Sequence, residues 1–117
     1  MNDNAKKWVA ALRSGKYPQG KSWLLKDGKY CCLGVACELA AQTGLTSSPS
    51  HPQFKNVVTF DGEDAFLPSS VRKWLGLVEV DGAPKNGPSL VDLNDKGKTF
   101  EEIADFIESE PEGLFRK

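Results

Sequence analysis

The residues from Cys32 to Ala41 constrain the fold more than any other part of the sequence, because Glu38 is the only charged residue among them. Apolar residues recur there with the i, i+3, i+4, i+7 spacing of one helix face, at Leu33, Ala36, Cys37 and Ala40. Apolar neighbours extend this face almost around the helix, and Gly44 suits the left-handed residue that ends many helices. The pattern predicts a buried helix over residues 32–43, around which the rest of the chain packs.

Other helices are expected over residues 3–14, 71–75 and 100–107. Asn2 or Asp3 can cap the first of them. Thr99 and Glu102 form the capping-box pattern at the start of the last one. Residues 89–95 fit either a short helix or a turn with its apolar side chains tucked in.

Two Asp-Gly pairs, Asp27-Gly28 and Asp61-Gly62, predict tight hairpins, since both central residues of such turns need positive φ. The expected strand pairs are 23–26 with 29–31, and 57–60 with 65–67. A further strand is expected over 77–80, with loops over 45–53 and 83–89. Hairpins interrupted by helices are typical of the α+β class. At 117 residues, we expect a single small α+β domain with antiparallel hairpins packed around the buried helix.

The composition is that of an ordinary globular protein, with 39% hydrophobic and 26% charged residues. No apolar run approaches the roughly 18–20 residues that span a membrane. Residues 1–7 lack the apolar core of a signal peptide. We therefore expect a cytoplasmic protein without a membrane partner.

All three cysteines, Cys31, Cys32 and Cys37, lie in or beside the predicted buried helix. We expect reduced thiols that serve as small core residues. No metal site and no cofactor are expected, because a tetrahedral zinc site needs four ligands and His51 is the only histidine. A catalytic alternative is open. Cys32 lies near a helix N-terminus, where thiol pKa values fall, and His51 could act as its general base. The protein would then be a cysteine hydrolase.

The net charge of −1 conceals an asymmetry between the two ends of the chain. Residues 1–30 contain seven Lys or Arg and two Asp, hence a charge of +5, which leaves −6 on the remainder. The basic N-terminal part could bind an anionic ligand, or it could pair with the acidic C-terminal helix of the same chain.

The turn after the first helix concentrates groups that suit an anionic ligand such as a nucleotide. Arginine and lysine suit phosphate, and tyrosine suits a base. An Asn-Asp pair before the last helix could complete a pocket if the fold or a homo-oligomer brings it near. The candidate ligand-binding residues are Arg13, Lys16, Tyr17, Gln19, Asn94 and Asp95. The alternative is a solvated connector whose Tyr17 packs on the core, and an Asn-Asp pair bonded to its own backbone.

Residues 93–104 are weakly similar to the first half of a helix-turn-helix motif, in which a capped helix carries an Ile-Ala pair. A basic recognition helix should then follow. Residues 108–112 are instead acidic and contain Pro111, which would block a helix and repel phosphates. Duplex DNA is therefore not an expected partner.

Four blocks of the sequence resemble a family of small proteins of tailed phages and prophages, and the Cys-Cys-Leu-Gly-Val block is the most specific. The blocks are Ala11–Gly20, Tyr30–Val35, Leu67–Leu77 and Leu93–Ala104. The resemblance implies a setting, a small accessory protein made in an infected bacterial cytosol, rather than an activity. Such proteins often bind a host protein or sequester a nucleotide signal of an antiviral system.

These observations lead to the hypothesis of a non-enzymatic binding protein of phage type that interferes with host defence or metabolism. Its partner would be a host protein or a small anionic ligand such as a nucleotide. The cysteine hydrolase that uses Cys32 and His51 is the alternative from another class.

Overall fold

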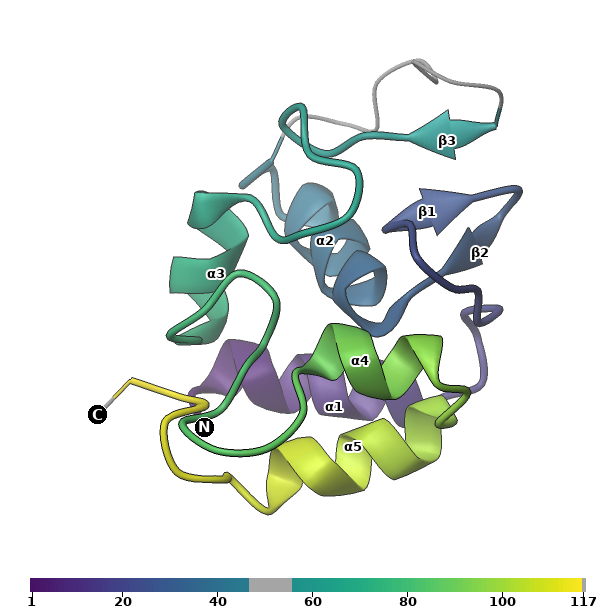
Figure 1. Ribbon diagram of the computed structural model, residues 1–117. Helices are drawn as coiled ribbons and strands as arrows, with labels where there is room; N and C mark the ends of the chain where they lie inside the picture. The colour runs from purple at the N-terminus through teal and green to yellow at the C-terminus, as the bar shows by residue number, and fades with distance from the viewer. Residues whose placement is uncertain (47–55, 117) are drawn as a thin grey trace.

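The computed structural model describes residues 1–46 and 56–116 and shows an α+β domain (Figure 1). Within these residues the helices are α1 (Asp3–Arg13), α2 (Cys32–Gln42), α3 (Ser69–Leu75), α4 (Leu90–Asp95) and α5 (Phe100–Glu108). The strands are β1 (Leu25–Lys26), β2 (Lys29–Tyr30) and β3 (Val57–Val58), which form an antiparallel sheet in the order β2-β1-β3. None of the described helices is long and apolar enough to cross a membrane.

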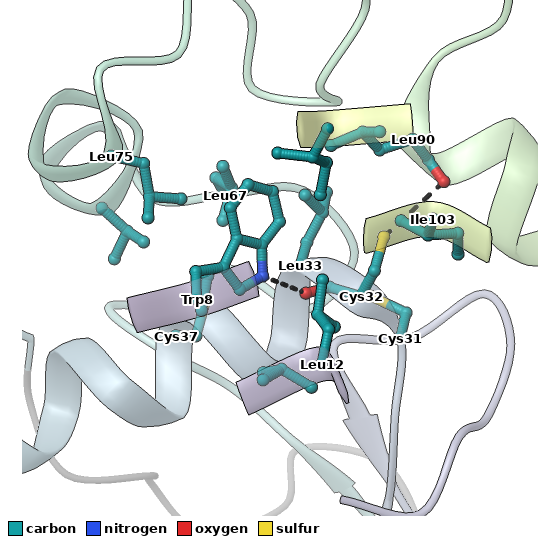
Figure 2. Close-up of a cluster of buried hydrophobic side chains, with 14 of the residues drawn as sticks. Trp8, Leu12, Cys31, Cys32, Leu33, Cys37, Leu67, Leu75, Leu90 and Ile103 are labelled. Carbon is teal, nitrogen blue, oxygen red and sulfur yellow. Dashed lines mark hydrogen bonds between the residues drawn. The ribbon is translucent and has the colours of Figure 1, made fainter. Parts of the chain in front are cut away.

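Helix α2 is the centre of the fold, as its apolar pattern predicts. It contacts α1, α3, α4 and β2. In Figure 1 these elements lie around it, and α5 lies farther away, against α1 and α4. Figure 2 shows Trp8 of α1 packed against the start of α2, where its indole Nε1 donates a hydrogen bond of 2.9 Å to the carbonyl oxygen of Cys32. A buried indole N–H needs such an acceptor, so this bond fixes α1 against α2.

Gly34 allows α2 to approach the chain that enters the sheet. A Cβ atom at this position would lie 1.7 Å from the carbonyl oxygen of Leu24, far inside van der Waals contact. The glycine of the Cys-Cys-Leu-Gly block is therefore required by close packing of two backbone segments.

The hairpin around Asp27 and Gly28 is confirmed, although its strands are shorter than the expected 23–26 and 29–31. The φ values of Asp27 and Gly28 are 53° and 75°, and the register pairs Leu25 with Tyr30 and Lys26 with Lys29. The positive φ values match the right-handed twist of the two strands. Strand β3 pairs with the other edge of β1.

The prediction of a second hairpin was wrong in its strand pairing. The turn at Asp61 and Gly62 forms, and Phe60 and Glu63 exchange two hydrogen bonds of 2.9 Å across it. Residues 65–67 nevertheless form no strand. Leu67 donates instead to the carbonyl oxygen of Val80 at 3.0 Å, and Pro68, which has no N–H, leads directly into α3.

The strand expected over residues 77–80 is also absent. Leu77 makes only an isolated bridge with Phe115, and the N–H of Val78 donates to Leu114. Leu114 itself is completely buried. The C-terminal segment therefore docks on this stretch and supplies the contacts that a neighbouring strand would have made.

The two helices at the ends of the chain lie side by side in Figure 1. Asn2 caps α1, and the capping box of Thr99 and Glu102 begins α5, as expected. Residues 90–95 are a helix capped by Ser89, so the helix and not the turn is the correct alternative for this segment. In the loop over 83–89, Pro84 is buried and only residues 85–88 are exposed. Most of the loop over 45–53 lies outside the described residues.

Candidate functional site

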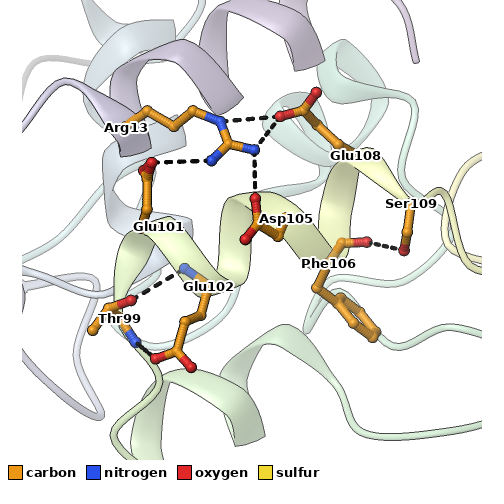
Figure 3. Close-up of polar contacts among 8 residues, drawn as sticks. All are labelled: Arg13, Thr99, Glu101, Glu102, Asp105, Phe106, Glu108 and Ser109. Carbon is orange, nitrogen blue, oxygen red and sulfur yellow. Dashed lines mark hydrogen bonds and ion pairs between the residues drawn. The ribbon is translucent and has the colours of Figure 1, made fainter.

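Arg13 is held by three carboxylates on α5 (Figure 3). Its guanidinium pairs with Glu101 at 3.2 Å, with Asp105 at 2.8 Å and with Glu108. Hydrogen bonds to Glu108, and next to Asp105, raise the pKa of Arg13 above its ordinary value. The basic N-terminal part therefore meets the acidic C-terminal helix at this point, and Arg13 is engaged within the chain.

Lys16 and Tyr17 lie in a different place, a hollow between α1 and α2 that Lys7, Leu39 and Gln42 also line. The ring of Tyr17 packs edge-on against Tyr30, with 5.4 Å between ring centroids. Tyr17 thus forms part of the packing between the α1 connector and the hairpin, as the structural alternative for this residue predicts.

Asn94 is completely buried at the centre of a polar network. Its Oδ1 accepts from the N–H of Cys32 and from Nε2 of Gln19, each at 3.1 Å. Its Nδ2 donates to the carbonyl oxygen of Gly20 at 2.8 Å. Because the Cys32 N–H belongs to the first turn of α2, Asn94 satisfies a donor that the helix itself leaves unpaired.

Gln19 and Asp95 complete this network. Gln19 donates to the carbonyl oxygen of Lys98 at 2.7 Å and accepts from the N–H of Phe100 at 3.1 Å. The carboxylate of Asp95 accepts from the N–H of Ser22 at 2.8 Å. The fold therefore brings Gln19, Asn94 and Asp95 together but places the other three candidate residues elsewhere.

Beside this network lies a hollow that we call the lysine groove, of about 230 Å³. Its lining residues are Gly20, Lys21, Ser22, Trp23, Lys26, Asp27 and Lys29. In the described part of the chain, none of its three lysines forms an ion pair with a carboxylate. The ammonium group of Lys26 lies over the ring of Trp23, 5.8 Å from its centroid. The groove thus combines an excess of positive charge, three lysines against the carboxylate of Asp27, with an aromatic face.

Two features of the lysine groove carry an energetic cost. Lys26 and Lys29 are directly opposite each other in the hairpin, and like charges in that arrangement are destabilising. Ser22 has a φ of 70°, and the N–H of Trp23 donates to the carbonyl oxygen of Lys21 at 2.8 Å. This is the strained form of the γ-turn, and such strain concentrates at functional sites.

The lysine groove was not among the sites predicted from the sequence, although the sequence contains one signal for it. A two-residue turn places the residues on either side of it opposite each other, so the predicted Asp27-Gly28 hairpin already implied a facing Lys26 and Lys29. The contribution of Trp23 and Lys21 depends on the γ-turn at Ser22, which no local pattern indicates.

The comparison with protein families matches residues 1–111 to the family described as "Domain of unknown function (DUF8296)". The chain belongs to this family. The match includes the polar network and every residue of the lysine groove. No curated protein and no solved structure matches the chain.

Within this family domain, the three cysteines are free and buried, as the core interpretation predicts. Cys32 and Cys37 have no exposed surface. The thiol of Cys32 lies 3.6 Å from the carbonyl oxygen of Leu90 (Figure 2). Burial raises the pKa of Cys31 to about 11 and the pKa values of the other two well above their ordinary value. The thiols are therefore protonated and shielded at neutral pH, which does not suit a nucleophile, and His51 lies outside the described residues.

We predict that no cysteine reacts rapidly with a thiol reagent in the native protein at pH 7.5, because the reactive thiolate is scarce and covered. Reaction with an aromatic disulfide, followed by absorbance, should reach three thiols per chain only after denaturation. Rapid native modification of Cys32 would contradict the described burial and would restore the hydrolase alternative.

No group of three or more His, Cys, Asp or Glu side chains in residues 1–46 and 56–116 is arranged to hold a metal ion. Nor does a helix follow α5 in residues 109–116, where a recognition helix would be needed.

Proposed function

We propose that the protein is a non-enzymatic accessory protein of tailed-phage type, which acts in the cytosol of the bacterial host by binding. We further propose that the lysine groove holds an anionic ligand such as a nucleotide. The observation that carries this proposal is the concentration of Lys21, Lys26 and Lys29 beside the ring of Trp23.

The chemistry of the groove fits a phosphate-bearing ligand. Ammonium groups form charge-assisted hydrogen bonds with phosphate oxygens, and the indole ring of Trp23 offers a stacking surface for a base. An anion between Lys26 and Lys29 would also relieve their mutual repulsion. The proposed ligand class is the one predicted from the sequence, but most of the residues that would bind it are different.

The polar network holds two backbone groups of residues that line the lysine groove. Asp95 holds the N–H of Ser22, and Asn94 holds the carbonyl oxygen of Gly20. We assign these two residues the role of positioning the groove, since their polar atoms are engaged within the chain. Arg13, Lys16 and Tyr17 stay predictions for a separate site.

A host protein is the second candidate partner, and exposed apolar side chains favour it. Phe66, Val78 and Val80 are between 36% and 48% exposed, and the hydrogen bond from Leu67 to Val80 places two of these segments side by side. Neighbouring exposed apolar side chains often mark a protein-binding surface.

The test is a titration with adenosine and guanosine 5′-triphosphates by isothermal calorimetry in the presence of EDTA. Each charge-assisted contact contributes roughly 1.5–3 kcal/mol. We therefore expect Lys21→Gln combined with Lys29→Gln to weaken binding by at least about tenfold while the circular dichroism spectrum is unchanged.

The matched control is Lys6→Gln combined with Lys73→Gln, which removes the same charge from exposed positions outside the groove. Equal loss of affinity in both double variants would show that only overall charge matters and would contradict a groove site. Native mass spectrometry of protein purified gently from bacterial cytosol then reveals whether a nucleotide or a host polypeptide is retained.

A further inference from the structure

A second hollow, of about 320 Å³, adjoins the lysine groove, since Gly20 and Lys21 line both. The rest of the second hollow is lined by Gln19, Asn94 and Gly97. The two hollows are therefore neighbours with Lys21 between them, and we refer to them together as the depression. A ligand with two linked units can place one unit in each hollow and the linkage beside this lysine.

Hydrogen bonds hold the backbone of Gly20, the residue at which the two hollows meet. The N–H of Gly20 donates to Tyr30 at 2.7 Å, and its carbonyl oxygen accepts from Asn94 at 2.8 Å. A Cβ atom on Gly20 would lie 2.8 Å from the Cβ atom of Lys29, so the two sides of the groove approach as closely as a glycine permits. Such a preorganised surface loses little conformational entropy when a ligand binds.

The charges along the depression are predominantly positive. The lysine groove has three lysines and one carboxylate, that of Asp27, on its lining. The second hollow adds no carboxylate to its lining, and the nearby carboxylate of Asp95 is engaged by the N–H of Ser22. A single phosphate would contact only part of this positive surface. A ligand with one phosphate in each hollow would contact all of it.

A ligand in the lysine groove stays partly exposed to solvent, because Lys21, Ser22 and Lys29 on its lining are exposed, and this exposure distinguishes between ligand types. Sites for small molecules usually enclose most of the ligand. Sites for single-stranded nucleic acids are open grooves with positive charge and an aromatic platform. The open depression with Trp23 in one half therefore fits a chain of nucleotides better than an isolated nucleotide.

We propose that the ligand of this site is an oligonucleotide, with successive nucleotides in the two hollows and the phosphodiester between them on Lys21. One base stacks on Trp23 as Lys26 moves from the ring to a phosphate. The proposal rests on the proposed function and deepens it, because it assigns the ligand at least two phosphodiester-linked units.

The test compares uridine 5′-monophosphate with 5′-phosphorylated oligouridylates of two, four and eight nucleotides by calorimetry at about 50 mM salt, where phosphate contacts are strong. We expect the dinucleotide to bind at least about tenfold tighter than the monophosphate, in line with a second stacked and charged unit. Inorganic pyrophosphate, which is comparably charged but has no bases, should bind more weakly than the dinucleotide.

Two variants locate the effect. Lys21→Gln should reduce dinucleotide affinity about tenfold and monophosphate affinity less than about threefold, because the monophosphate can still use Lys26 and Lys29. Trp23→Leu should weaken both nucleotides but not pyrophosphate. Lys6→Gln is the control for charge, and the circular dichroism spectrum of each variant monitors folding.

The possible outcomes test the oligonucleotide ligand and the anion site separately. A monophosphate that binds as tightly as the dinucleotide, or pyrophosphate that equals it, would overturn the oligonucleotide proposal and leave the anion site intact. Failure of all these ligands would overturn the anion site of the proposed function as well. If affinity stops rising at two units, the ligand is a short oligonucleotide; if it continues to rise at eight, the ligand is a single strand.

Discussion

Replacement of Gly34 by alanine is expected to destabilise the protein by about 3 kcal/mol or more, at the upper end of overpacking effects. The new Cβ atom would lie 1.7 Å from the carbonyl oxygen of Leu24 and 2.6 Å from its carbon. These are backbone atoms, which cannot turn aside as a side chain can. Helix α2 and the start of the sheet would have to separate, with loss of core contacts on both.

This result would oppose the usual trend, since alanine in a helix interior is favoured over glycine by about 1 kcal/mol. Thermal unfolding followed by circular dichroism should show Tm lowered by about 10 °C or more. Gly15→Ala is the matched control, because a Cβ atom there meets nothing within 4 Å and only its φ of 76° is unfavourable. A Gly34→Ala protein as stable as the wild type would show that the close approach to Leu24 is wrong.

Replacement of Asn94 by leucine is expected to cost about 3–5 kcal/mol, because leucine has a similar size but no polar atoms. The N–H of Cys32 and the carbonyl oxygen of Gly20 would both lose their side-chain partner. Each orphaned buried group costs about 1–3 kcal/mol. Urea unfolding gives the measurement as a change in free energy.

The matched control is Asn86→Leu at an exposed position, where little change is expected. A second variant, Asn94→Asp, retains the acceptor for Cys32 but replaces the donor to Gly20 with a second oxygen. We expect it to be destabilised too, since a buried carboxylate next to a carbonyl oxygen is unfavourable. If Asn94→Leu is as stable as the control, the polar network is not a structural element of the fold.

Both predictions concern the start of α2, and both matter for the proposed site. Gly20 links the polar network to the proposed site. Asn94 holds the carbonyl oxygen of Gly20, and Gly20 lines both hollows. A destabilised network should therefore also weaken ligand binding. The Lys21 and Trp23 variants avoid this ambiguity, since both residues lie on the lining of the groove and their side chains are not part of the network.

The sequence by itself determined the elements whose signals are local. The apolar spacing predicted α2, the caps predicted α1 and α5, and the Asp27-Gly28 pair predicted the first hairpin. Each of these signals depends on residues within about four positions of one another, where backbone geometry and capping decide the structure. For that reason they could be recognised without knowledge of the remaining fold.

Only the tertiary structure decided which distant segments meet. Strand β3 pairs with β1 rather than with residues 65–67, and Arg13 forms an ion pair with Asp105 of α5. The amide of Asn94 reaches the start of α2 across 62 positions of sequence. Such contacts depend on the relative placement of whole elements, since a side chain binds the nearest suitable group in space. The lysine groove is of the same kind, because its depression exists only once the hairpin, Ser22 and the Asn94 network are assembled together.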